Sequence, residues 1–69
     1  EKELLIRLMV EQMPPQRKKI FTMSRYQGLS NDEIARKLGI SKHTVENNLS
    51  ISLKELRELM LAFVIFFLV

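Results

Sequence analysis

The chain has 69 residues, no cysteine and a net charge of +3, which leaves room for one small domain and excludes both a disulfide framework and a thiolate metal site. Its two glycines, two prolines and abundant leucine, lysine, arginine and glutamate favour helices, so the sequence predicts an all-α fold, a small helical bundle. Residues 14–54 hold eight basic side chains against three acidic ones, a surplus that attracts nucleic acid, although a solvated helix surface has the same composition.

Residues 2–12 are predicted to form a first amphipathic helix. The apolar residues there recur at helical spacing, with charged residues between them. They are Leu4, Leu5, Leu8 and Met9. The pair Pro14-Pro15 ends this helix, because a residue before proline is pushed out of the helical conformation and proline suits the first position of a new helix.

A second helix is predicted to start at this proline pair. It directs three residues toward the core, namely Ile20, Phe21 and Ser24. Gly28 stops it by offering the left-handed backbone conformation. Tyr26 and Leu29 are expected to close the corner that follows.

A third, short helix is predicted from a capping box, Ser30-Asn31-Asp32-Glu33. The serine hydroxyl accepts from the Glu33 amide while the glutamate side chain reaches back to the Ser30 amide. Gly39 ends this helix, whose inward residues are Ile34, Ala35 and Leu38.

Ser41 is expected to cap a fourth and longer helix. Its inward stripe keeps a spacing of three or four residues over more than four turns, and consists of Val45, Leu49, Leu53, Leu56 and Met60.

The third and fourth helices together are predicted to form a helix-turn-helix over residues 30–50. A small Ala35 lets the helices cross closely, Gly39 permits the sharp turn, and apolar residues on both sides fix the angle between them. That angle allows the second helix of the unit to lie in a major groove with its first turns against the base edges.

Several short motifs also resemble region 4 of extracytoplasmic-function sigma factors over most of residues 1–58. The resemblance implies that this domain recognises the minus-35 promoter element and contacts the beta-subunit flap of core RNA polymerase, and we expect it to act in the cytoplasm. The matching runs are Met13-Pro14-Pro15-Gln16-Arg17, Ile20-Phe21, Gly28-Leu29-Ser30, Glu33-Ile34-Ala35, Thr44-Val45-Glu46-Asn47 and Leu53-x-x-Leu56-Arg57.

The resemblance places base and backbone contacts on the start of the fourth helix. Asn47 suits a bidentate pair with adenine, Glu46 accepts from cytosine, and Thr44 or Ser50 serves a base or a phosphate. A phosphate also suits the helix start, where the dipole and free amides favour an anion. The expected DNA-binding residues are Arg36, Lys37, Ser41, Lys42, His43, Thr44, Glu46, Asn47, Ser50 and Ile51.

Two positions depart from the family pattern. Ile51 stands where relatives have a basic residue, and Asn48 stands where they have histidine, so one phosphate contact is in doubt. Ile51 either touches a thymine methyl or packs against another helix, and we favour the latter. His43 is the only histidine, which argues against a metal site. No cofactor and no catalytic arrangement is expected.

Residues 59–69 form an apolar tail that follows the domain of residues 1–58. The tail is too short to span a bilayer, which takes about 20 apolar residues. A helix that is apolar on every side must be covered, so we expect self-association, or docking onto polymerase or an anti-sigma protein. In the alternative, the tail folds back over the first helix and belongs to the core.

Two other functions stay open at this stage. Response-regulator output domains share a similar Leu-Ser-x-x-Glu-Ile-Ala-x-x-Leu run, although they usually lack the Pro-Pro-x-Arg start. A protein-interaction module, in which the tail and the inward residues of the fourth helix serve protein partners, is the second alternative.

Overall fold

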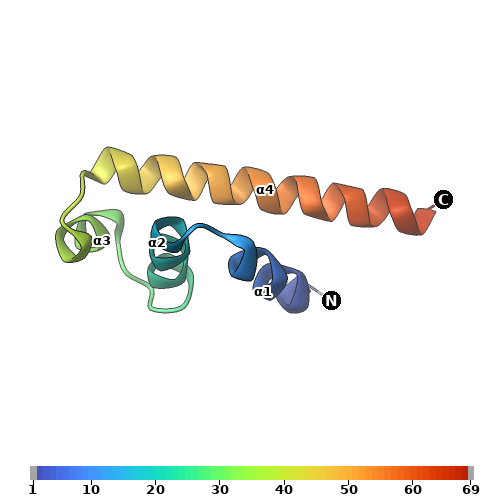
Figure 1. Cartoon of the computed structure of the whole chain (residues 1–69), viewed down its shortest axis with the longest axis horizontal. Helices are drawn as coiled ribbons and strands as arrows, with labels where there is room; N and C mark the ends of the chain where they lie inside the picture. Colours follow the sequence, from blue (N-terminus) through green and yellow to red (C-terminus); the bar gives the residue numbers. More distant parts are fainter. Residues whose placement is uncertain (1, 69) are drawn as a thin grey trace.

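The structure is a computed structural model that describes residues 2–68, and within that range it contains four helices and no strand. The helices are α1 (Lys2–Gln12), α2 (Pro15–Arg25), α3 (Asn31–Leu38) and α4 (Lys42–Leu68). Helix α4 runs along the whole length of the molecule, and α3, α2 and α1 lie in turn along one side of it (Figure 1). The prediction of an all-α bundle with a long last helix is confirmed.

Two apolar clusters hold the three shorter helices against α4. The first joins α2, α3 and the start of α4 and consists of Ile20, Ile34, Ala35 and Val45. The second joins α1 and α2, has Leu56 of α4 packed against it, and consists of Ile6, Met9, Val10, Met13 and Phe21. Burial of these side chains is the main force that shapes the domain.

The proline pair and the following turn lie where the sequence predicts them. Pro14 flanks α2 in an extended conformation (φ −58°, ψ 152°) and Pro15 is the first helical residue. Helix α2 ends at Arg25, and Gly28 beyond it is left-handed (φ +66°). Leu29 is half-buried as expected, but Tyr26 is exposed; it does not close the corner.

The orientation of α1 differs from the prediction. Leu4 and Leu8 are 53% and 48% exposed, while Ile6, Val10 and Met13 are buried. Only Met9 of the predicted stripe is buried, and Leu5 is half-buried. Apolar residues surround most of this helix, so spacing alone did not identify the face that α2 and α4 would cover.

The inward stripe of α4 also differs at one position. Leu53 is 58% exposed, whereas the neighbouring Ser52 is fully buried. The Ser52 hydroxyl donates to the Asn48 carbonyl oxygen at 2.9 Å, which satisfies the buried polar group within the helix itself. A serine therefore occupies the position that the sequence analysis gave to a leucine.

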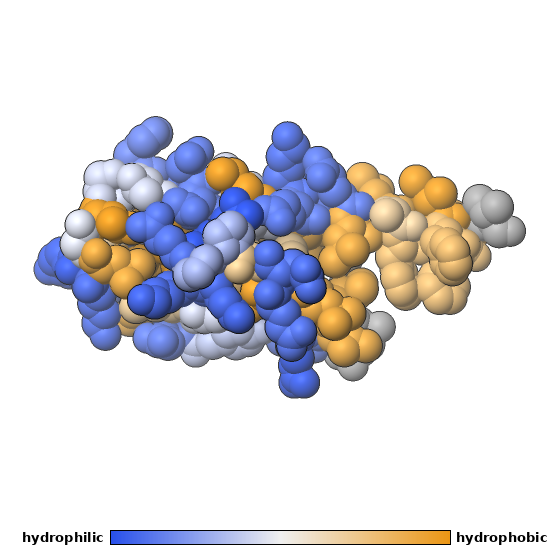
Figure 2. Space-filling model, in the orientation of Figure 1, coloured by the Kyte–Doolittle hydropathy of each residue, from blue (hydrophilic) through white to orange (hydrophobic). Residues whose placement is uncertain are grey.

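The apolar tail continues α4 without a break as far as Leu68, and Val69 lies outside the described residues. It extends past α1 (Figure 1), and the end of the molecule that it forms is apolar (Figure 2). Phe66 and Leu68 are 79% and 81% exposed, so the tail up to Leu68 does not fold back into the core. None of the helices within residues 2–68 is long and apolar enough to cross a bilayer.

Candidate nucleic-acid interface

Helix α3 begins with the capping box that the sequence predicts. The Glu33 amide donates to Ser30 Oγ at 3.2 Å, and the Ser30 amide donates to Glu33 Oε1 at 3.0 Å. The hydrogen bond from the Ser30 backbone lowers the pKa of the Glu33 carboxyl, and the bond with the Ser30 side chain adds to this effect. The two bonds fix where α3 starts.

The turn between α3 and α4 is built on Gly39. Its backbone is left-handed (φ +67°), and the amides of Gly39 and Ile40 both donate to the Ala35 carbonyl oxygen. Ser41 Oγ then accepts from the Thr44 amide at 3.0 Å and lies 2.8 Å from Thr44 Oγ1. Each end of the turn is therefore closed by a local cap.

Three fully buried side chains set the angle between the two helices. They come from three different helices and belong to one cluster, namely Ile20, Ile34 and Val45. Ala35 is also buried in this cluster, where its small side chain lets α3 and α4 approach. The predicted helix-turn-helix is therefore present. Its first helix is α3, and its second helix is the start of α4, which continues well beyond the unit.

The first turns of α4 turn one polar face to solvent. A spacing of one, three or four residues keeps these side chains on one side of the helix, and the exposed ones are Lys42, His43, Glu46, Asn47 and Ser50. Val45 points the opposite way, into the core. None of Lys42, Glu46 and Asn47 is turned inward, which is the arrangement that reading a duplex requires.

The remaining predicted positions divide between exposed and half-buried. Arg36 and Lys37 on α3 are exposed, as is Ser41, whose hydroxyl is engaged in the cap. Thr44 and Ile51 are half-buried. Eight of the ten predicted positions are therefore exposed, and two are only partly accessible.

An acidic residue that the sequence analysis did not single out lies within this interface. Asp32 Oδ2 of α3 is 3.7 Å from the Lys42 Nζ atom of α4. The two residues line an open groove of about 500 Å³ together with Ala35, Arg36 and Ile40. The only sequence signal for this pair is the capping box, which places Asp32 in the first turn of α3.

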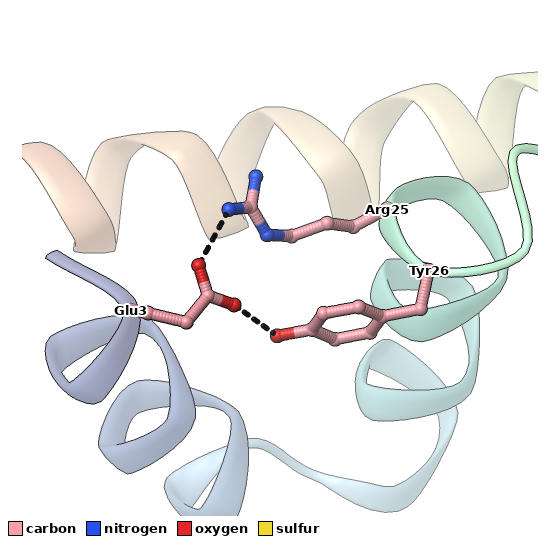
Figure 3. A network of polar contacts seen from close by, with 3 residues as sticks. All are labelled: Glu3, Arg25 and Tyr26. Atoms are coloured by element: carbon pink, nitrogen blue, oxygen red, sulfur yellow. Dashed lines mark hydrogen bonds and ion pairs between the residues drawn. The ribbon is translucent and has the colours of Figure 1, made fainter.

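A second polar cluster joins α1 to the end of α2, away from the turn. Arg25 Nη2 donates to Glu3 Oε2 at 3.2 Å, and the Tyr26 hydroxyl donates to Glu3 Oε1 at 3.4 Å (Figure 3). Its bond to Glu3 raises the pKa of the Arg25 guanidinium. Tyr26 therefore links two helices through its hydroxyl, and Arg25 is used inside the domain.

Within the described residues, no group of three or more histidine, cysteine, aspartate or glutamate side chains is placed to hold a metal ion. The cationic and amide side chains at the start of α4 are the candidate functional groups, because they are exposed. Their chemistry suits hydrogen bonding to base edges and phosphates.

Comparison with known protein families agrees with this geometry. The model of the family described as "Sigma-70, region 4" matches residues 3–56 of the chain, a range that includes α1 except its first residue, α2, α3 and the first half of α4. No curated protein sequence matches the chain. The matched range ends before the apolar tail.

Proposed function

Because the chain belongs to the sigma-70 region 4 family, we propose that it recognises the minus-35 element of promoters by inserting the start of α4 into the major groove. Domains of this family are the DNA-binding parts of sigma factors, which direct transcription initiation. The supporting observation is the exposed face of Lys42, Glu46 and Asn47 on a helix whose opposite side is anchored by the fully buried Val45. We further propose that the chain is of the extracytoplasmic-function type and acts in the cytoplasm, where RNA polymerase transcribes.

We assign direct base contacts to the exposed positions one and two turns into α4. Asn47 has an amide that pairs with the adenine edge, and Glu46 has a carboxylate that accepts from the cytosine amino group. His43 and Ser50 flank them on the same exposed face. These contacts would supply sequence preference.

Contacts with the DNA backbone are assigned to the cations and amides around the turn. Lys42 lies at the start of α4, where the helix dipole favours a phosphate, and Arg36 and Lys37 are exposed on α3. Ser41 and Thr44 bond to each other and offer a phosphate their remaining hydrogen-bonding capacity. The half-buried Ile51 is assigned to helix packing, as the sequence analysis favours.

Docking on RNA polymerase needs a separate surface, and α2 and α4 offer one. An open groove of about 320 Å³ lies between them, with mostly apolar walls, and is lined by Phe21, Ser24, Arg25, Leu49, Leu53 and Leu56. An apolar helix or loop of the beta flap is the occupant we propose for this groove. An anti-sigma protein that covers the same groove would prevent polymerase from binding there. We propose no catalytic step for the chain itself.

A salt titration tests the DNA-binding proposal. The chain should bind a duplex that holds a minus-35 element more tightly than a scrambled duplex, with affinity falling as salt rises. For about five phosphate contacts the log–log slope should be near −4 to −5. A slope near zero, or equal affinity for both duplexes at every salt concentration, contradicts promoter reading by this surface.

A further inference from the structure

The second half of α4 exposes more apolar surface than a small soluble domain normally does. At roughly 200 Å² for a phenylalanine and roughly 100 Å² for an aliphatic side chain, the exposed fractions of the large apolar residues between 53 and 68 amount to on the order of 700 Å². This surface lies all around the helix, and an exposed apolar surface of this size is typical of a site where a protein partner binds.

Part of this surface is an ordered stripe along one side of the helix, which we call the α4 stripe. It consists of Leu53, Leu56, Met60, Val64 and Phe67. The first four line an open groove of about 420 Å³, with Arg57 and Leu61 beside them. Phe67 continues the stripe one turn further, and its ring centroid lies 4.5 Å from that of Phe63. Apolar residues at such a spacing are typical of helix pairs.

The order of residues in the α4 stripe is the same in both directions from Met60. The spacings are three, four, four and three residues. If two copies of the helix pack antiparallel with Met60 at the centre, Leu53 of one copy meets Phe67 of the other, and Leu56 meets Val64. Each copy then contributes the same surface, as a two-fold axis requires.

We propose that a second copy of this chain covers the α4 stripe, in an antiparallel pair of α4 helices centred on Met60. The large Phe67 ring of each copy fills the groove beside Leu53 and Leu56 of the other. Both grooves are filled in this arrangement. A parallel pair would leave them facing each other without a bulky side chain to enter.

Charge favours the same orientation. In the antiparallel pair the two basic segments of residues 14–54 lie at opposite ends of the pair. In a parallel pair they would lie side by side, and like charges across an interface cost affinity.

A lipid surface fits the tail less well than a second copy does. A helix that lies flat at a membrane surface needs a polar face, and residues 59–68 contain no charged or hydroxyl side chain.

The pair would exclude polymerase from the groove between α2 and α4, because both uses need Leu53 and Leu56. This consequence rests on the proposed function, but the pair itself does not. In the pair, the two Lys42 residues would lie roughly 50 Å apart, at about 1.5 Å per helical residue. That exceeds the ~34–36 Å between successive major grooves on one side of a duplex, so the pair is not a reader of adjacent half-sites.

Sedimentation of the 69-residue chain over a range of concentrations tests the pair. We expect a reversible monomer–dimer equilibrium. Val64→Glu and Phe67→Glu should each weaken it by roughly 100-fold, since each would bury a carboxylate without a partner. Ile65→Glu is the matched control. Ile65 is 61% exposed, between Val64 at 49% and Phe67 at 69%, and the substitution adds the same charge about 100° or more away from the stripe. Circular dichroism checks that each variant stays helical.

Cysteine cross-linking tests the orientation, and the chain contains no cysteine of its own. Leu53→Cys and Phe67→Cys chains, mixed and oxidised, should form the mixed disulfide faster than either symmetric one. A wild-type chain that remains monomeric, a dimer that Val64→Glu leaves intact, or symmetric disulfides as the main product each overturns the proposal. Sedimentation of a monomeric chain with phosphatidylcholine vesicles would likewise overturn it in favour of lipid.

Discussion

Arg17 of α2 and Glu55 of α4 form an ion pair, with Nη2 and Oε1 3.0 Å apart and side chains that are 19% and 40% exposed. The Arg17 Nε atom is buried and has no hydrogen-bond partner among the described residues. The positive charge of the guanidinium is therefore balanced by the carboxylate of Glu55. This contact ties the middle of α4 to α2, next to the groove that we assign to polymerase.

Loss of Glu55 should destabilise the domain modestly. Glu55→Ala is expected to lower the free energy of unfolding by about 0.5–1 kcal/mol, because both groups are partly solvated and water screens the pair. Urea unfolding measures this change. The same substitution in an Arg17→Met chain should cost less, since no cation is left unpaired. Equal costs in the two backgrounds would show that the pair contributes nothing.

The capping box should make stability depend on pH. The pKa of Glu33 is lower in the folded chain than its ordinary value of 4.5, so the ionised carboxyl favours folding above pH 4.5. This contribution is lost as the pH falls through the folded pKa. Glu33→Gln keeps an acceptor for the Ser30 amide but does not titrate. The difference in Tm between the two chains should shrink below pH 4.5, and a difference that stays constant would contradict this role.

The turn between α3 and α4 should tolerate asparagine better than alanine. A Cβ atom at Gly39 would meet nothing within 4 Å, so only the left-handed backbone (φ +67°) opposes a side chain there. Gly39→Ala should cost about 1–2 kcal/mol of folding free energy. Gly39→Asn should cost less, because asparagine adopts this conformation more readily. Urea unfolding measures the free energy of unfolding of both variants. Equal losses of stability would show that the left-handed backbone conformation is not what opposes a side chain at this position.

Two adjacent asparagines on α4 offer a matched test of base reading. Asn47 is exposed, whereas Asn48 is half-buried and its Nδ2 donates to the Thr44 carbonyl oxygen at 2.8 Å. Asn47→Ala should cost about 1–3 kcal/mol of binding to promoter DNA and relax the preference at one base pair. Asn48→Ala should leave that preference unchanged. Titration of duplexes substituted at each base pair measures both, and uniform losses from Asn47→Ala would argue against a base contact.

The acidic residue beside Lys42 should weaken binding to DNA. Asp32→Ala removes the carboxylate 3.7 Å from Lys42 Nζ, so we expect affinity to rise by about 0.2–1 kcal/mol at low salt. The gain should be the same on specific and scrambled duplexes and should fade as salt screens the charge. Glu11→Ala on α1 is the control for net charge alone. If Glu11→Ala gives the same gain, Lys42 does not contact a phosphate.

Sequence rules predicted the parts of this fold that depend on neighbours in the chain. The capping box of Ser30 and Glu33, the left-handed Gly39 and the Ser41 cap are all confirmed. Each needs only residues within four positions, so its signal survives in any tertiary context. The family match over residues 3–56 agrees with the motifs found in the same range.

The parts that depend on distant residues were harder to predict. Which apolar face of α1 is buried depends on how α2 and α4 pack against it. Leu4 and Leu8 lie on the face that stays exposed. Ser52 is buried, and its hydroxyl is satisfied by a bond within its own helix; apolar periodicity does not register such a residue. Likewise, the sequence gives no sign that two of its arginines form ion pairs within the domain. In the structure Arg17 pairs with Glu55, and Arg25 pairs with Glu3.

Helix α4 continues without interruption from Lys42 to Leu68, so the end that we assign to DNA and the apolar tail form one rod. Whatever holds the tail would therefore set the azimuth at which the other end meets a duplex. One residue inserted between them would rotate the two ends relative to each other by about 100°. The number of residues in this helix thus fixes how the two surfaces are rotated relative to each other about the helix axis. A deletion or insertion between them would change that angle without altering any side chain of either surface.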